Sequence, residues 1–335
     1  MRKGRLRDVL KVAISLGLTA YLFARADTAA ALAVVRRADP ALLALALAVY
    51  FGALMANAAK WWLVLRGQGA AVPYREVLSL SFIGLFFGNF LPSSVGVDVV
   101  RGYGLARYLA RAGDAAVSVA LDRLVGVLAF LSTAAFMSLL AVFSWGRTDL
   151  LPLGWAVWSV WMGMAVLLLV LLSRRLWLLV RRVSGLPVIR RGAGLLERLS
   201  GLVQAHRERP AALVCAFAVG LLVVLLSNMA NYLVASAAGV GLPLAYVCLF
   251  NPMLAFAPAI VPSVGGLGVN QGAYDLLYAS IGGLIERPAA LGVSVLMQLI
   301  AYVSSLPGGA LWLRRKQAGA KAVVLGRGVA GSGDT

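Results

Sequence analysis

Long apolar runs occupy most of this chain and restrict it to one broad class of fold. Runs of about 20 residues, the length that crosses a bilayer as a helix, occur roughly at 9–25, 41–65, 117–143, 154–172, 211–236 and 289–313. Only helices and closed barrels satisfy their own backbone hydrogen bonds in lipid. Because 61% of the residues are hydrophobic and 13% are charged, we expect an all-α, polytopic membrane protein with six full spans in a single transmembrane domain, residues 1–335.

The positive charge of the chain gathers beside these apolar runs. The net charge is +18, and basic residues cluster in 1–11, 174–209 and 314–327. Lys and Arg accumulate on the cytoplasmic flanks of spans, so this distribution predicts cytoplasmic N- and C-termini and argues against nucleic acid as a partner. The excess of Arg over Lys, 26 to 5, is associated with GC-rich bacterial genomes, so the expected location is the bacterial cytoplasmic (inner) membrane. The tail 317–335 is expected to be disordered.

Two further apolar stretches, 77–109 and 244–283, are too broken to be single helices. Each contains a Pro/Ser/Gly segment, at 91–96 and at 261–266. Irregular backbone at bilayer depth persists only where it is buried in protein or lines a wet cavity. A matched pair of interrupted segments is typical of a transporter's binding site. We therefore expect two re-entrant helical hairpins that enclose one site near the bilayer midplane.

The order of spans predicts an inverted repeat. With the basic patches inside, 77–109 starts and ends inside, whereas 244–283 starts and ends outside. The order span, span, hairpin, span then occurs twice with opposite orientation, in pseudo-repeats of about 1–150 and 153–316. The loop that contains Arg36 and Arg37 would lie outside, against the usual bias, and its helix-favouring run predicts an interfacial amphipathic segment.

The first hairpin carries a charged pair at helical spacing. Asp98 and Arg101 are three residues apart, so they share one helix face and can pair. A lone charge at the centre of a membrane helix costs about 2.5–3.5 kcal/mol on insertion scales. The pair therefore either stabilises the hairpin or handles a charged ligand, and both interpretations stay open. Asn89, Pro92 and Ser93 in the preceding turn complete this set of candidates.

The second hairpin offers a polar face of its own. Gln271 and Asp275 are four residues apart and lie beside Tyr274 on one helix face. Asp275 is equally compatible with an interfacial position near the outer surface. The candidates from this hairpin are Pro262, Ser263, Gly266, Asn270, Gln271 and Asp275.

The remaining polar candidates lie in the apolar spans. Asp122 and Arg123 open the third span, either at the mouth of the cavity or at the cytoplasmic interface. Two pairs at spacing i, i+3 are expected either to support the site or to join helices by hydrogen bonds: Asn57 with Lys60, and Asn228 with Asn231. Trp61 and Trp62 are expected in the interfacial aromatic belt. No spacing of Cys, His or acidic residues predicts a metal, and no cofactor is expected.

Three segments, 89–105, 120–130 and 262–277, resemble the lysylphosphatidylglycerol synthase transmembrane-region family of flippase-like membrane proteins. The resemblance runs over about 10–315. Three family patterns are matched here: Pro-x-x-x-Gly-x-acid-x-x-Arg by Pro92, Gly96, Asp98 and Arg101; acid-Arg-Leu by Asp122, Arg123 and Leu124; and the glycine pattern by Gly265, Gly266, Gly268 and Gly272. Gln271 stands where the family usually has Glu, which removes a carboxylate that Asp275, one turn on, could replace.

The resemblance implies flipping of a phospholipid or polyprenyl lipid. We therefore expect a lipid flippase, without enzymatic activity, whose partners are membrane lipids: an anionic or aminoacylated phospholipid or a polyprenyl lipid. A second copy of the chain and a lipid-modifying enzyme are the protein partners to consider. The alternatives are a proton-coupled transporter of small solutes and an intramembrane transferase acting on lipid-linked substrates.

Overall fold

The computed structural model describes residues 28–90, 96–173, 209–257 and 265–330, and this part of the chain is helical without strands. Its elements are α2 (Thr28–Arg37), α3 (Pro40–Gly67), α4 (Tyr74–Phe90), α5 (Gly96–Leu109), α6 (Ala112–Phe143), the 3-10 turn η1 (Thr148–Leu150), α7 (Leu151–Leu172), α10 (Pro210–Ala237), α11 (Leu244–Leu254), α13 (Val269–Tyr274), the π-helical segment η2 (Asp275–Ile281) and α14 (Arg287–Ala330).

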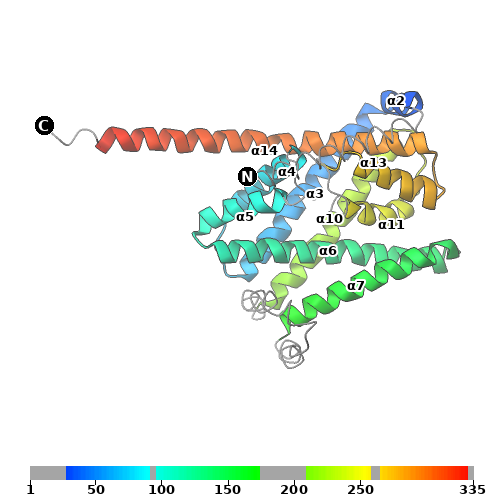
Figure 1. Ribbon diagram of the computed structural model, residues 1–335, viewed down its shortest axis with the longest axis horizontal. Coiled ribbons are helices and arrows are strands. Elements are labelled where there is room, and N and C mark those ends of the chain that lie inside the picture. The colour runs from blue at the N-terminus through cyan, green and yellow to red at the C-terminus, as the bar shows by residue number, and fades with distance from the viewer. Residues whose placement is uncertain (1–27, 91–95, 174–208, 258–264, 331–335) are drawn as a thin grey trace, which may run out of the picture.

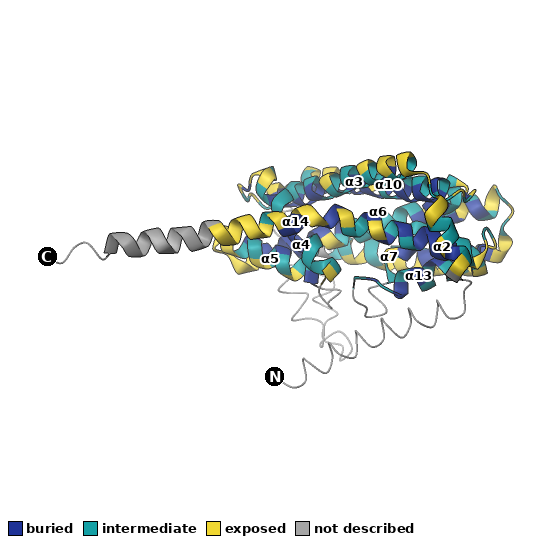
Figure 2. Ribbon diagram, turned by 90° about the horizontal axis from the view of Figure 1, so that it is seen from above, coloured by how far each residue is buried: buried dark blue, intermediate teal, exposed yellow. Residues whose placement is uncertain are grey.

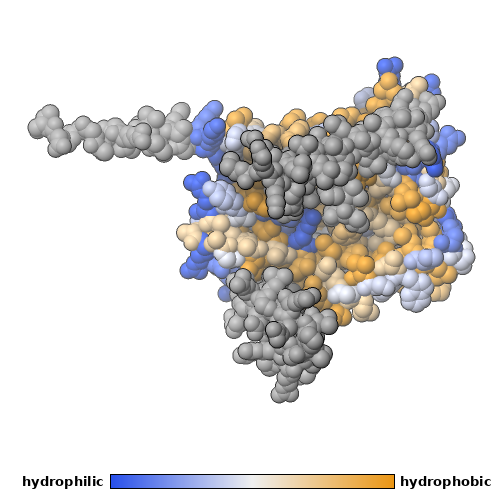
Figure 3. Space-filling model, in the orientation of Figure 1, coloured by the Kyte–Doolittle hydropathy of each residue, from blue (hydrophilic) through white to orange (hydrophobic). Residues whose placement is uncertain are grey.

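Five of these helices are long and apolar enough to span a membrane: α3, α6, α7, α10 and α14. They match five of the six predicted runs, and the sixth run, 9–25, lies outside the described residues. In Figure 3 hydrophobic residues fill much of the visible middle of the bundle, and hydrophilic residues gather toward its two ends. This distribution suits a bilayer, whose core takes apolar side chains and whose interfaces take charged ones.

The last helix is longer than the sequence predicted. Residues 317–330 were expected to be disordered, but α14 continues as a helix to Ala330 and extends beyond the other helices (Figure 1). The segment contains several alanines and no proline. The four alanines favour a helix and the three glycines oppose it by about 1 kcal/mol each, but no proline is present to end a helix that has already begun.

Each broken stretch folds as a group of short helices. The stretch 77–109 corresponds to α4 and α5, and the stretch 244–283 contains α11, α13 and η2. Figure 1 shows α4 and α5 at the end of the bundle from which α14 extends, and α11 and α13 at the opposite end. The two hairpins therefore enter the bundle from opposite ends.

Glycines fix the first hairpin closely to its neighbours. A Cβ on Gly84 would lie 2.7 Å from Cγ of Arg101 in α5, and one on Gly88 would collide with Val97. On the other side, a Cβ on Gly308 of α14 would collide with the backbone carbonyl of Phe82. Small residues let membrane helices pack backbone to backbone. These glycines therefore hold α4 against both α5 and α14.

Helices α3 and α10 lie side by side over one face of the molecule (Figure 2). They end in matching turns, in which Gly69 (φ +78°) and Gly239 (φ +70°) adopt the left-handed conformation. The two turns also form the same backbone hydrogen bonds 170 positions apart. Residues 64–77 and 234–247 therefore share one local geometry, a helix end followed by a proline that starts the next helix.

Candidate functional site

The two hairpins meet inside the bundle. The side-chain amide of Asn89, at the end of α4, donates to the carbonyl of Ala301 in α14 at 3.2 Å. The backbone carbonyl of Asn89 approaches Gly265 so closely that a Cβ at Gly265 would collide with it. Gly265 also has a φ of +56°, which a residue with a side chain rarely adopts. The chain segments next to the two breaks are thus in direct contact.

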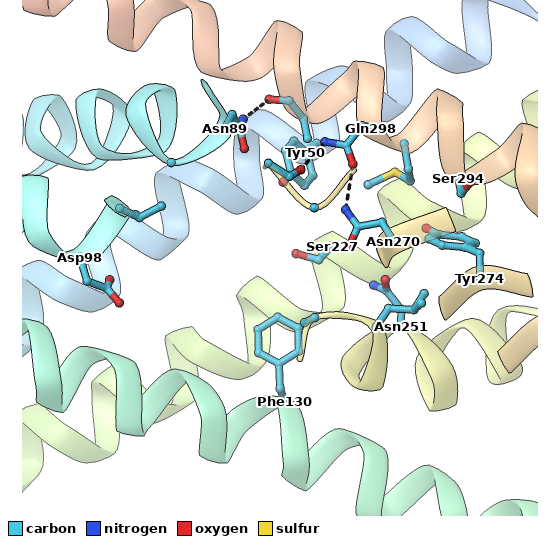
Figure 4. A pocket seen from close by; sticks show the side chains of 18 of the residues that line it. Tyr50, Asn89, Asp98, Phe130, Ser227, Asn251, Asn270, Tyr274, Ser294 and Gln298 are labelled. Carbon is cyan, nitrogen blue, oxygen red and sulfur yellow. Dashed lines mark hydrogen bonds between the residues drawn. The ribbon is translucent and has the colours of Figure 1, made fainter. Parts of the chain in front are cut away.

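A cavity of about 610 Å³ lies between the two hairpins. Figure 4 shows side chains reaching it from α4 and α5, from α11, α13 and α14, and from α6 through Phe130. Its polar lining consists of Tyr50, Asn89, Asp98, Arg123, Ser227, Asn251, Asn270, Tyr274, Ser294 and Gln298. The cavity therefore combines amide and hydroxyl groups with one carboxylate and one guanidinium.

Gln298 of α14 fixes the second hairpin against the cavity. It accepts a hydrogen bond from Asn270 at 2.8 Å and donates one to the backbone carbonyl of Gly265 at 2.9 Å. The first of these bonds is drawn in Figure 4. One side chain thus holds the start of α13 and the segment just after the break, so the cavity wall on this side is anchored to α14.

Hydrogen-bonded asparagines join α10 to α11 and α13. Asn251 donates to Asn228 at 2.7 Å, and Asn231 donates to Asn251 at 3.1 Å and to the hydroxyl of Tyr274. Asn228 and Asn231 were expected either as parts of the site or as interhelical links. Their bonds join helices, and it is Asn251 and Tyr274 that line the cavity.

A buried cluster of charges joins α3, α5 and α6. The carboxylate of Asp122 lies 2.9 Å from Arg101 and 3.2 Å from Lys60, and all three residues are buried. The ammonium of Lys60 also donates to the backbone carbonyl of Asp122 at 3.1 Å. A buried charge is tolerated when it is paired. Asp122 has a cation beside each carboxylate oxygen and accepts a hydrogen bond from Arg101 on one of them.

Trp61 belongs to this cluster, so its expected place in the interfacial belt is wrong. Its ring is fully buried, with the guanidinium of Arg101 4.0 Å from the ring centroid, and its indole nitrogen donates to Ser118 at 3.2 Å. An aromatic face attracts a guanidinium more strongly once both are desolvated. This pairing keeps Trp61 inside the bundle.

Asp98 and Arg123 form the edge of the cluster that faces the cavity. The predicted pair of Asp98 with Arg101 is present, at 3.7 Å, and Arg123 approaches the second carboxylate oxygen of Asp98 at 3.8 Å. The side chain of Arg123 is 59% exposed. Arg101 and Asp122 do not line the cavity. Asp98 and Arg123 are therefore the charged groups within reach of a ligand.

The other candidates take varied places. Gly266 and Asn270 line the cavity, as does Asn89. Gln271 is buried and accepts a hydrogen bond from the amide of Gly268 at 2.8 Å, so it caps α13. Asp275 pairs with Arg287 at 3.6 Å away from the cavity, and Asn57 is half-buried outside its lining. Four candidates lie outside the described residues: Pro92, Ser93, Pro262 and Ser263.

Several lining residues were missed from the sequence. Ser294 and Gln298 are four residues apart within the last span, and Asn251 stands directly before a proline inside an apolar run. A search for polar side chains at helical spacing within the apolar spans would have found the first two. Among the residues that the structure describes, no group of three His, Cys, Asp or Glu side chains lies close enough to hold a metal ion.

The chain matches the family described as Lysylphosphatidylglycerol synthase TM region over residues 9–309. No curated protein and no solved structure matches it significantly. With several apolar helices of spanning length, it is a multi-pass membrane protein related to lipid handling. The chain therefore belongs to the lysylphosphatidylglycerol synthase transmembrane-region family.

Proposed function

We propose that this protein is a lipid flippase of the bacterial cytoplasmic membrane. It moves a lipid with a polar headgroup, a phospholipid or a polyprenyl lipid, and it does so without catalysing a reaction. The observation that supports this best is the cavity bounded by both hairpins, which enter from opposite ends of the bundle. Binding sites between broken helices of opposed repeats are typical of transporters.

The cavity suits a headgroup better than a whole lipid. Its volume, about 610 Å³, falls within the range of small-molecule sites, about 300–1,000 Å³. Arg123 offers an exposed guanidinium for a phosphate. The amides of Asn89 and Asn270 offer hydrogen bonds to hydroxyl or ester oxygens. In this proposal the headgroup occupies the cavity while the tails remain in the bilayer.

An inverted repeat would explain how the site opens to each side in turn. The matching turns at 64–77 and 234–247 are 170 positions apart, and in the sequence the same offset relates Pro92 to Pro262 and Arg101 to Gln271. The proposed architecture has six spans, the first at 9–25, with both termini in the cytoplasm. Rocking of one repeat against the other then alternates access to the cavity.

Transport by a single-residue variant tests this proposal. Purified protein is placed in vesicles that contain fluorescent phosphatidylglycerol or a fluorescent polyprenyl phosphate, and the lipid reaching the outer leaflet is followed by chemical quenching. For the lipid that wild type transfers, Arg123→Gln should lower the rate of transfer by about tenfold or more. The reason is that one charge-assisted hydrogen bond to the headgroup contributes about 1.5–3 kcal/mol. The matched control is Arg111→Gln, which removes a 78% exposed guanidinium outside the cavity and should leave transfer unchanged.

The alternatives give different results in the same vesicles. If neither lipid moves in wild type, or if Arg123→Gln moves its lipid at the wild-type rate, the proposed path is wrong. Uptake of the water-soluble glycerophosphoglycerol headgroup without lipid transfer would instead identify a carrier of small solutes.

A further inference from the structure

A second hollow lies on the other side of the first hairpin. This groove has a volume of about 690 Å³ between α4, α5 and α14, and none of its lining residues lines the cavity. Its walls are largely apolar, with Leu80, Ile83 and Phe87 from α4, Val99 from α5 and Trp312 from α14. The first hairpin thus separates a polar cavity from an apolar groove.

Basic side chains gather at one end of the groove. Arg315 is neutralised there by Glu76, through two hydrogen bonds of 2.8 and 2.7 Å. Arg107 and Lys316 also line the groove, and neither has an acidic partner within ion-pair distance among the described residues. Lys316 instead lies 5.4 Å from the ring of Trp312. The mouth of the groove therefore carries two cations that a negatively charged group can pair with.

The length of the groove matches one leaflet of a bilayer. Glu76 at the mouth and Phe87 are eleven residues apart in α4, which corresponds to about 16 Å of helix. Half of a hydrocarbon core of about 30 Å is about 15 Å. A molecule with its charge at Arg107 and Lys316 would thus reach the bilayer midplane at the far end of the groove.

The groove is also accessible from the side. Val99 and Tyr103, on the α5 wall, are 61% and 66% exposed. In the proposal below this wall borders the bilayer, so an acyl chain enters the groove sideways without passing through water. A small soluble anion would leave the apolar walls uncovered, whereas every CH₂ group of an acyl chain that is buried against them adds favourable apolar contact.

We propose that this groove binds an anionic glycerophospholipid, with its phosphate between Arg107 and Lys316 and one acyl chain along Leu80, Ile83 and Phe87. The site is separate from the cavity and does not depend on the proposed flippase activity. Since Val99 of the groove directly follows Asp98 of the cavity in α5, the bound lipid contacts the turn that carries the carboxylate of the cavity.

Lipid binding to the charged mouth is measured by native mass spectrometry of protein released from nanodiscs. The nanodiscs contain equal amounts of phosphatidylglycerol and phosphatidylcholine. Wild type should retain phosphatidylglycerol in preference to phosphatidylcholine. The double variant Arg107→Gln/Lys316→Gln should bind it about thirtyfold more weakly, because each basic residue near the surface contributes about 1 kcal/mol. The matched control, Arg111→Gln/Arg314→Gln, removes equal charge from the flank of the first hairpin and from α14 without touching the groove, and should keep the preference.

A variant that fills the groove distinguishes a lipid bound inside the groove from a lipid held only by surface charge. Val99→Trp should abolish retention of phosphatidylglycerol, whereas Leu313→Trp, at an exposed position of α14 outside the groove, should not. Thermal unfolding and gel filtration check that each variant is folded. Equal retention of both lipids by wild type, retention by the double variant, or retention by folded Val99→Trp would each overturn the proposal.

Discussion

Arg101 of α5 and Asp122 of α6 form an ion pair of 2.9 Å in which the side chains are only 7% and 3% exposed. Lys60 of α3 reaches the other oxygen of the same carboxylate at 3.2 Å. One buried aspartate therefore connects three helices, including the second helix of the first hairpin. In an alternating-access cycle we expect α3, α5 and α6 to move as one unit, because separating them would leave a charge buried and unpaired.

Removing one partner of this cluster should destabilise the fold. Arg101→Gln leaves Asp122 with only Lys60, and breaking a buried pair in this way typically costs about 3–5 kcal/mol. Unfolding in mixed detergent micelles should show a loss of this size. Arg111→Gln, which breaks only the exposed pair with Asp114, should change the unfolding free energy by less than about 1 kcal/mol. Equal stability of the two variants would contradict the buried cluster.

The close contact between α14 and α4 should make Gly308 intolerant of any side chain. Gly308→Ala places a Cβ against the carbonyl of Phe82, and backbone cannot move away as a flexible side chain would. We expect a loss of about 1–3 kcal/mol from overpacking. Gly163→Ala in α7 is the control, since a Cβ there meets nothing within 4 Å. That variant should be as stable as wild type or slightly more stable.

Loss of the amide of Gln298 should loosen the second hairpin locally. Gln298→Met keeps the size of the side chain but removes the bonds to Asn270 and to the carbonyl of Gly265. Hydrogen exchange of residues 265–274 should become about tenfold faster, which corresponds to about 1.4 kcal/mol of local stability. Met297→Leu, a substitution at the neighbouring lining position, should leave exchange as in wild type. Unchanged exchange in Gln298→Met would show that Gln298 does not anchor the hairpin.

The sequence predicted those features that depend on length and on chain breaks. Five apolar runs became helices of spanning length because the width of the bilayer sets that length. The two stretches that contain the Pro/Ser/Gly segments fold as short helices rather than as single spans, because proline and glycine are the residues that favour a helix interior least. The direction of single side chains depends on tertiary packing instead. Asp122 and Arg123 are neighbours in sequence, yet successive residues of a helix point about 100° apart, so one is buried and the other lines the cavity.

Two side chains lie elsewhere than their sequence context suggested. Tryptophan is enriched at membrane interfaces, but the ring of Trp61 packs against the guanidinium of Arg101 inside the bundle. Gln271 was grouped with the cavity because of its spacing, and it instead accepts a hydrogen bond from the amide of Gly268. The place of Trp61 cannot be read from local sequence, because it depends on how α3, α5 and α6 pack. The bond of Gln271 is local, since Gly268 lies only three residues earlier, and it is the cap that a Gln at the third helical position can form.

The central claim is that water reaches the cavity between the hairpins from both sides of the membrane. Single cysteines at Asn89, Ser227 and Asn270, which line the cavity, are introduced into protein that carries Cys215→Ser and Cys248→Ala. A membrane-impermeant maleimide is then applied separately from each side of reconstituted vesicles. The account predicts labelling of all three positions from both sides, and no labelling of a cysteine at Ala58, which is fully buried. Protection of all three cavity positions from both sides, or labelling of all three from one side only, would contradict it.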